Sequence, residues 1–198
     1  MSRVGKTIIK IPTGVKVEFS NGMVSVTGPK GDVLMQEIKA PISVDVQTDT
    51  VLVNRGDDLA GSRALHGLYN RLIQNMIEGV TKGYTKTLIL NGVGYKANMR
   101  GEDLLLNLGK SHQSEVKTET GIKFKVLTPQ EVQALNLGKE GIAVVVQVSG
   151  NNKEQVGSVA SRIRSLRPVE PYHLYGIRYA GEHVIRKESK SGKKGGKK

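Results

Sequence analysis

The chain has 198 residues, with 30 Lys and Arg against 18 Asp and Glu, so its formal net charge is +12 and its pI is near 9.9. This excess of positive charge favours a polyanionic partner. The absence of Cys excludes disulfides, thiolate metal sites and thiol nucleophiles, and no apolar run approaches the roughly 20 residues of a membrane-spanning helix.

The first half of the chain begins with alternating apolar and polar residues, a pattern typical of β-strands. Strands at 15–19 and 22–27 flank the hairpin sequence Ser20-Asn21-Gly22, and further strands are predicted at 33–38, 42–46 and 51–53. A helix is then expected after the acids Asp57 and Asp58, ending near Gly79. Its apolar stripe comprises Leu65, Leu68, Tyr69, Leu72, Ile73 and Met76.

The second half repeats this order of elements. Strands are predicted at 87–90, 104–108, 122–127 and 142–148. A helix follows with apolar positions at Val156, Val159, Ala160 and Ile163. We interpret the repeated order as a duplication, in which the second copy carries an insertion around Glu131 to Glu140.

The pattern predicts an α+β fold made of two similar domains, each an antiparallel sheet covered by one main helix. The first domain is expected at 1–82 and the second at 83–182, with a hinge at Gly79 to Gly83. Residues 183–198 lack an apolar pattern and are rich in Lys, Gly and Ser. We therefore expect them to form a basic, disordered C-terminal tail.

The start of the chain has no apolar segment of the kind found in secretory signals, so a cytoplasmic location is expected. Aromatic residues make up only 4% of the chain. This argues against recognition of splayed bases by many stacking platforms. Contacts to the RNA backbone and grooves are expected instead.

Two glycine motifs resemble nucleotide-binding sequences. Gly92-Val93-Gly94-Tyr95-Lys96-Ala97 matches the dinucleotide fingerprint G-x-G-x-x-G/A. That fingerprint requires a helix to begin at the motif, whereas a turn and a strand are predicted here, so we interpret it as a tight hairpin. Gly28-Pro29-Lys30-Gly31 matches the GXXG loop of KH modules, but it joins two strands and is interpreted as a turn.

No catalytic or metal-binding pattern is found. The four histidines, His66, His112, His173 and His183, are far apart, and none has a neighbouring carboxylate at metal-ligand spacing. No nucleophile elbow or Walker loop is present either. We predict no enzyme activity, no cofactor and no metal site.

The second helix and the segment after it are strongly basic. Arg162, Arg164 and Arg167 lie within six residues with no acid between them. A solvated helix face is one interpretation, and a phosphate-binding edge is the one that the basic tail favours. Pro168 cannot continue a helix, so the segment to Pro171 is expected to run as a rigid, exposed strap.

Several ordered motifs resemble the ribosomal protein L6 family of the bacterial large subunit. They cover roughly residues 1–182 and include Val26-Thr27-Gly28-Pro29-Lys30-Gly31, Arg63-Ala64-Leu65-His66-Gly67-Leu68, Gly92-Val93-Gly94-Tyr95-Lys96-Ala97, Leu108-Gly109-Lys110-Ser111-His112, and Arg167-Pro168-Val169-Glu170-Pro171-Tyr172. Two departures stand out. His173 to Tyr175 replace a Lys-Gly-rich run, and Glu131 to Glu140 looks longer than usual.

The resemblance implies a non-enzymatic protein of the ribosome that binds large-subunit rRNA, mainly through the second domain, near the site where translation factors dock. Neighbouring large-subunit proteins are then expected partners, and a membrane is not. The predicted RNA-binding residues are Arg3, Lys6, Lys96, Lys110, Arg162, Arg164, Arg167, Arg178, Arg186, Lys187, Lys190, Lys193, Lys194, Lys197 and Lys198. An enzyme acting on RNA and a free RNA chaperone are the alternative interpretations.

Overall fold

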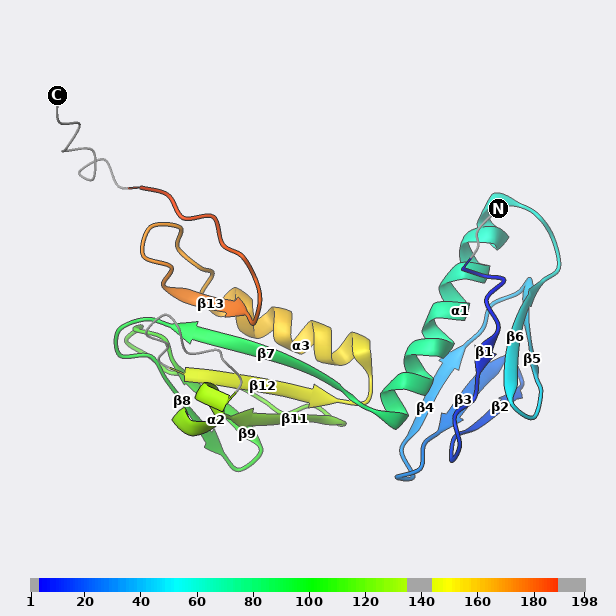
Figure 1. Ribbon diagram of the computed structural model, residues 1–198, viewed down its shortest axis with the longest axis horizontal. Coiled ribbons are helices and arrows are strands. Elements are labelled where there is room, and N and C mark those ends of the chain that lie inside the picture. Colours follow the sequence, from blue (N-terminus) through cyan, green and yellow to red (C-terminus); the bar gives the residue numbers. More distant parts are fainter. Residues whose placement is uncertain (1–3, 135–143, 189–198) are drawn as a thin grey trace. The chain divides into compact units, whose positions relative to one another are not determined.

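The computed structural model describes residues 4–134 and 144–188, and the chain divides into two compact units (Figure 1). The first unit comprises Met1–Tyr84 with Gly150–Lys153, and the second comprises Thr85–Ser149 with Glu154–Lys198. Each unit contains antiparallel strands and one long helix. The predicted α+β fold is thereby confirmed.

In the described part of the first unit, the strands form two three-stranded antiparallel sheets with the orders β2-β3-β4 and β1-β6-β5. The predicted hairpin joins β2 to β3, where Asn21 (φ 50°) and Gly22 (φ 75°) both adopt the left-handed conformation that such a tight turn requires. The strands are β1 (Ile9–Lys10), β2 (Lys16–Ser20), β3 (Met23–Thr27), β4 (Val33–Glu37), β5 (Ile42–Val46) and β6 (Thr50–Arg55).

Helix α1 (Ala60–Thr81) covers these sheets largely with the predicted stripe, since Tyr69, Ile73 and Met76 are buried and Leu65 and Leu72 pack against the same core. Leu68 is 50% exposed, whereas His66 and Asn70 are buried. The helix begins after Asp57 and Asp58, as predicted, but without a side-chain cap. It also continues through Gly79, which has no room for a Cβ because its position lies against the backbone carbonyl of Asn151.

The buried polar residues of α1 hold the N-terminal segment of the first unit. His66 Nε2 lies 2.8 Å from the carbonyl of Val53, and the Asn70 amide donates to the carbonyls of Gly5 (3.2 Å) and Thr7 (2.8 Å). A Cβ on Gly5 would lie 2.5 Å from the His66 ring, so only glycine fits there. These contacts satisfy polar groups that would otherwise destabilise the core.

The described part of the second unit contains a four-stranded sheet of order β11-β12-β7-β13 and a three-stranded sheet of order β10-β9-β8. The strands β7 and β13 pair antiparallel, with Ile177 opposite Leu90. The strands are β7 (Tyr84–Asn91), β8 (Lys96–Arg100), β9 (Asp103–Asn107), β10 (Ser114–Val116), β11 (Ile122–Val126), β12 (Val144–Gly150) and β13 (Gly176–Tyr179).

Helix α3 (Lys153–Leu166) lies along the four-stranded sheet (Figure 1) and buries the four apolar positions that the sequence predicts, which are Val156, Val159, Ala160 and Ile163. The short helix α2 (Pro129–Ala134) was not predicted. It starts with a reciprocal cap, in which Thr128 N donates to the Glu131 carboxylate. Most of the predicted insertion at Glu131 to Glu140 lies outside the described residues.

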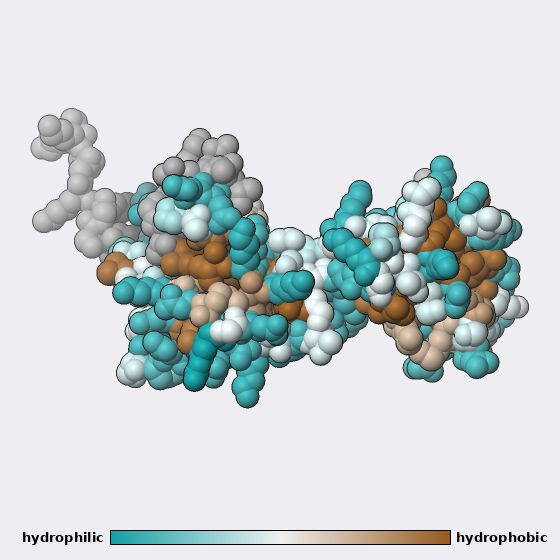
Figure 2. Space-filling model, turned by 90° about the horizontal axis from the view of Figure 1, so that it is seen from below, coloured by the Kyte–Doolittle hydropathy of each residue, from teal (hydrophilic) through white to brown (hydrophobic). Residues whose placement is uncertain are grey.

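Polar residues cover much of the face drawn in Figure 2, in both units. The largest fully buried side chains of each unit are apolar, such as Val24 and Ile73 in the first unit and Leu88, Leu90 and Ile163 in the second. No Lys, Arg, Asp or Glu is among the buried residues of the described part of the chain, so most of its basic side chains reach the surface.

Candidate nucleic-acid interface

A closed loop, residues 167–175, connects α3 to β13 and is here called the strap. Three backbone hydrogen bonds fix it: Ile177 N donates to Arg167 O (2.9 Å), Glu170 N to Tyr175 O (2.8 Å) and Leu174 N to Glu170 O (3.1 Å). The side chain of Asn91 on β7 donates to Leu174 O (3.1 Å). The strap is therefore closed by its own hydrogen bonds and held to the sheet near both of its ends.

The end of the strap requires glycine. Gly176 has a φ of 136°, and a Cβ at this position would lie 2.6 Å from the carbonyl oxygen of Pro168. The two arms of the strap thus approach each other too closely for any larger residue.

Basic groups from three distant segments meet at the strap. Lys110, which follows β9, donates from Nζ to the carbonyl of Leu166 at the end of α3 (3.2 Å). From the C-terminal segment, Arg186 Nε donates to Tyr172 O (3.2 Å) and Lys187 N donates to Pro171 O (2.9 Å). With Arg167 at the start of the strap, these residues make up what we call the strap cluster: Lys110, Arg167, Arg186 and Lys187, all exposed, of which Lys187 is held there by its backbone N–H.

The two arginines on α3 are paired with acids that lie far away in the sequence. Arg162 forms an ion pair with Glu119, and Arg164 forms one with Glu182. The hydrogen bond from Arg164 holds the pKa of the Glu182 carboxyl below its usual value, with a further contribution from the backbone N–H of Tyr179. The guanidinium of Arg164 also lies 5.7 Å from the centre of the Tyr179 ring.

The remaining predicted residues are dispersed. Lys6 is exposed in the first unit, Lys96 is exposed on β8, and Arg178 is half-buried on β13. None of these three belongs to the strap cluster. The residues outside the described part of the chain are Arg3, Lys190, Lys193, Lys194, Lys197 and Lys198.

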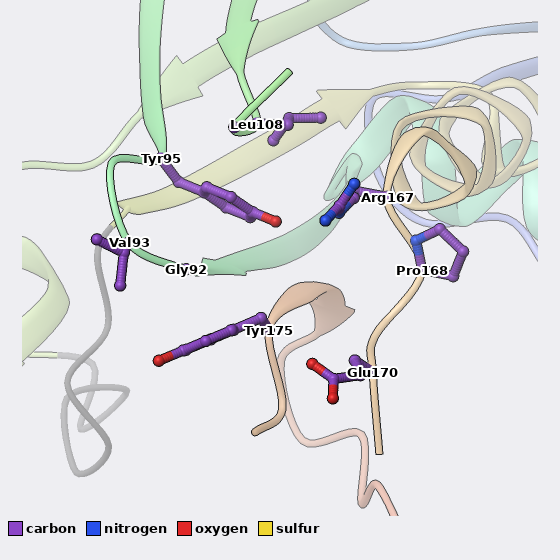
Figure 3. A pocket seen from close by; sticks show the side chains of 9 residues that line it. Gly92, Val93, Tyr95, Leu108, Arg167, Pro168, Glu170 and Tyr175 are labelled. Atoms are coloured by element: carbon purple, nitrogen blue, oxygen red, sulfur yellow. The ribbon is translucent and has the colours of Figure 1, made fainter. Parts of the chain in front are cut away.

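A cavity of about 630 Å³ lies beside the strap (Figure 3). It is lined by Tyr95, Arg167, Glu170 and Tyr175, among others, and by the glycine motif at Gly92. That motif is followed by β8 and not by a helix, as the sequence predicts. Its first glycine serves packing, because a Cβ on Gly92 would lie 2.6 Å from the Tyr95 ring.

Sequence reasoning missed Glu119 and Glu182 as partners of the arginines, and it missed Tyr95 and Tyr175 as neighbours. The spacing of these residues along the chain carries no signal of their proximity. In the part of the chain that the structure describes, no group of three or more His, Asp or Glu side chains is placed to hold a metal ion. No helix among the described residues is long and apolar enough to cross a membrane.

Comparison with known proteins identifies the family. The family model described as Ribosomal protein L6 matches residues 11–83 and 91–180. The chain belongs to the ribosomal protein L6 family. It is 48% identical over 193 residues to the large ribosomal subunit protein uL6 of Staphylococcus epidermidis and 46% identical to that of Staphylococcus aureus strain JH9, in each case covering 98% of this chain and all of the relative.

Membership of the L6 family confirms the resemblance seen in the sequence. It also assigns the chain to the ribosomal proteins and not to the enzymes, so the alternative of an RNA-processing enzyme is set aside. Of the predicted RNA-binding residues, Lys110, Arg186 and Lys187 are each hydrogen-bonded to the strap or to the end of α3 that precedes it.

Proposed function

We propose that the chain is a structural constituent of the large ribosomal subunit that binds large-subunit rRNA, mainly through its second unit, near the site where translation factors dock. It performs no catalysis of its own. Two facts support the ribosomal role: the L6 family model matches most of the chain, and the relatives at 46–48% identity are named as large-subunit proteins. Neighbouring ribosomal proteins are the other proposed partners.

The strap cluster is the observation that carries the proposed RNA contact. Its cations come from the turn after β9, the end of α3 and the C-terminal segment, so folding concentrates positive charge that the sequence disperses. Arg and Lys contact phosphate oxygens through charge-assisted hydrogen bonds. Backbone hydrogen bonds hold the strap in one conformation. The cations attached to it are therefore presented to folded RNA from an ordered backbone.

Arg162 and Arg164 contribute differently. Each is engaged by a carboxylate, and a guanidinium has five N–H donors, so each retains donors for a phosphate while its partner stays bound. The neighbouring carboxylate nevertheless repels phosphate. We therefore assign the larger share of binding energy to Arg167, for which no ion pair is found among the described residues.

The test is binding of the full chain to deproteinised large-subunit rRNA. A variant with Lys110, Arg167 and Arg186 changed to Ala should bind more weakly, and the slope of log K against log salt should fall by about two to three if each cation neutralises one phosphate. The matched control changes Lys10, Lys16 and Lys39, three exposed lysines of the first unit, to Ala. It removes the same charge and should have a smaller effect.

Two outcomes would contradict the proposal. Equal weakening by the two triple variants would show that only net charge matters, as expected for a free RNA chaperone. Loss of the wild-type chain from large subunits sedimented in high salt would also favour a chaperone, because an integral subunit protein remains bound.

A further inference from the structure

We propose that the cavity beside the strap is a stacking site for one unpaired nucleotide of the RNA, with the ring of Tyr175 as the platform. This inference rests on the proposed rRNA binding and adds a specific recognition element to it. The sequence had favoured backbone and groove contacts because aromatic residues are few. The structure shows two of those few, Tyr95 and Tyr175, lining the same cavity.

The cavity has a suitable size and composition. Its volume of about 630 Å³ falls within the range of about 300–1,000 Å³ typical of small-molecule sites. Tyr95, Arg167, Glu170 and Tyr175 surround it (Figure 3). These side chains come from the β7–β8 turn and from the strap, so folding of the second unit is needed to assemble them.

The two tyrosines have different roles. Tyr95 is only 7% exposed, and its ring covers Gly92, so it forms a wall of the cavity. Tyr175 is 40% exposed. Its ring stacks on His173 with the ring centres 5.6 Å apart and the planes 18° from parallel, and His173 does not line the cavity. The histidine therefore stacks on the ring from outside the cavity, while Tyr175 itself lines the cavity.

The platform is also preorganised. The backbone of Tyr175 accepts a hydrogen bond from Glu170 N, and Asn91 holds the preceding residue. A ring on a fixed backbone loses little conformational freedom when a base stacks on it, which favours affinity. Base–aromatic stacking is the usual way in which proteins hold an unpaired base of RNA.

The polar groups of the cavity match the two ends of a nucleotide. Arg167 is the cation among the residues that line the cavity, and its guanidinium can donate charge-assisted hydrogen bonds to the phosphate of the nucleotide. The Glu170 carboxylate, which also contacts His173 Nδ1 at 3.3 Å, would repel phosphate but accepts hydrogen bonds from the N–H groups of a base edge. A paired base cannot reach such a recess, because its edge is occupied and its faces are stacked within the helix.

The experiment compares full-length variants bound to deproteinised large-subunit rRNA. Affinity is measured by filter binding, and bases are probed with reagents that modify the Watson–Crick edges of unpaired bases. Tyr175→Ala should lower affinity by about five- to hundred-fold, the range expected for loss of one base stack. One base that the wild-type chain protects should become reactive. Tyr175→Phe keeps the ring and should retain both affinity and protection.

Tyr172→Ala is the matched control, because Tyr172 is 43% exposed on the same strap but does not line the cavity. Only its backbone carbonyl contacts Arg186, and that carbonyl remains in the variant. If Tyr175→Ala bound the rRNA with wild-type affinity and still protected the same base, the stacking site would be rejected but the proposed rRNA-binding function would not. Equal losses in both variants would reject the stacking site as well. Failure of the wild-type chain to bind the rRNA would reject both proposals.

Discussion

Arg164 and Arg167 are three residues apart on the chain, yet they occupy different electrostatic environments. Arg164 donates to Glu182 and lowers the pKa of that carboxyl, whereas Arg167 lines the cavity. We expect Arg164→Ala to raise the pKa of Glu182 toward its ordinary value, as measured by NMR titration of the side-chain carboxyl. Because the folded-state pKa is depressed, the pair stabilises the fold above the unfolded-state pKa, and this stabilisation is lost as the pH falls.

Titration of Glu182 in Arg162→Ala is the control, since Arg162 pairs with Glu119 instead. An unchanged Glu182 pKa in Arg164→Ala would contradict the assigned cause. In that case the main cause of the lowered Glu182 pKa would be the hydrogen bond from the backbone N–H of Tyr179, which is the second group that lowers it.

The same contrast predicts an order of effects on RNA binding. Arg167→Ala should weaken binding to the large-subunit rRNA more than Arg162→Ala or Arg164→Ala, because the latter two arginines are engaged by carboxylates. Arg167→Lys should recover part of the loss, since charge remains but bidentate geometry does not. Filter-binding titrations of the single variants check this order. A larger loss for Arg164→Ala would reverse the assignment.

At the scale of residues, the sequence identified the basic residues of the proposed interface but not how they are arranged. The motif Arg162, Arg164 and Arg167 was visible because its members are close along the chain. Its partners Glu119 and Glu182 were not, because ion pairing depends on which segments the fold brings together. For the same reason, no local pattern could place Arg186 beside the strap.

Helix α3 offers a direct test of the packing at the scale of an element. Ile163 is fully buried, so Ile163→Asp places an unpaired charge in the core and should cost about 3 to 5 kcal/mol of unfolding free energy. Ser161, on the exposed side of the helix, is the control, and Ser161→Asp should change stability by no more than about 0.5 kcal/mol. Urea denaturation of both variants measures the difference. Similar costs would mean that the helix face is wrongly assigned.

Elements with a long periodic pattern were predicted well, and short ones were missed. The apolar positions of α3 repeat over several turns, whereas β13 has four residues and owes its strand conformation to pairing with β7. Helix α2 could have been found from Thr128 and Glu131, which have capping-box spacing with Pro129 between them. In α1 five of the six predicted stripe residues pack on the core, but Leu68 is exposed. The burial of His66 and Asn70 was missed because the sequence does not reveal their backbone partners.

For the whole molecule, the prediction that the two domains fold independently can be tested by expressing residues 84–182 alone. These residues include a core of their own, with Leu88, Leu90, Val145 and Ile177 fully buried. We expect the fragment to unfold cooperatively in urea, as single domains of this size usually do. A fragment that is unfolded alone and gains structure only when residues 1–83 are added would contradict independent folding.

The basic C-terminal tail is predicted to bind RNA through charge alone. Within the predicted tail of residues 183–198, the last ten residues, 189–198, contain five lysines and no acid. If about half of these lysines engage phosphates, deleting them should lower the salt slope of rRNA binding by about two, while specificity should change little because backbone contacts carry no sequence information. Salt titrations of the full and shortened chains, with an unrelated RNA as competitor, measure both quantities. An unchanged salt slope would show that the tail does not contact RNA phosphates.

The anchoring of the N-terminal segment has a consequence for the order of events during synthesis. The hydrogen bond between Asn70 and Gly5 spans 65 residues of chain, and ribosomes add about 5 to 20 residues per second. Asn70, the hydrogen-bond partner of the Gly5 carbonyl, is therefore synthesised about 3 to 13 seconds after Gly5. Throughout that interval the first unit lacks the helix that covers its sheets, so its nascent strands have to remain unaggregated until α1 emerges.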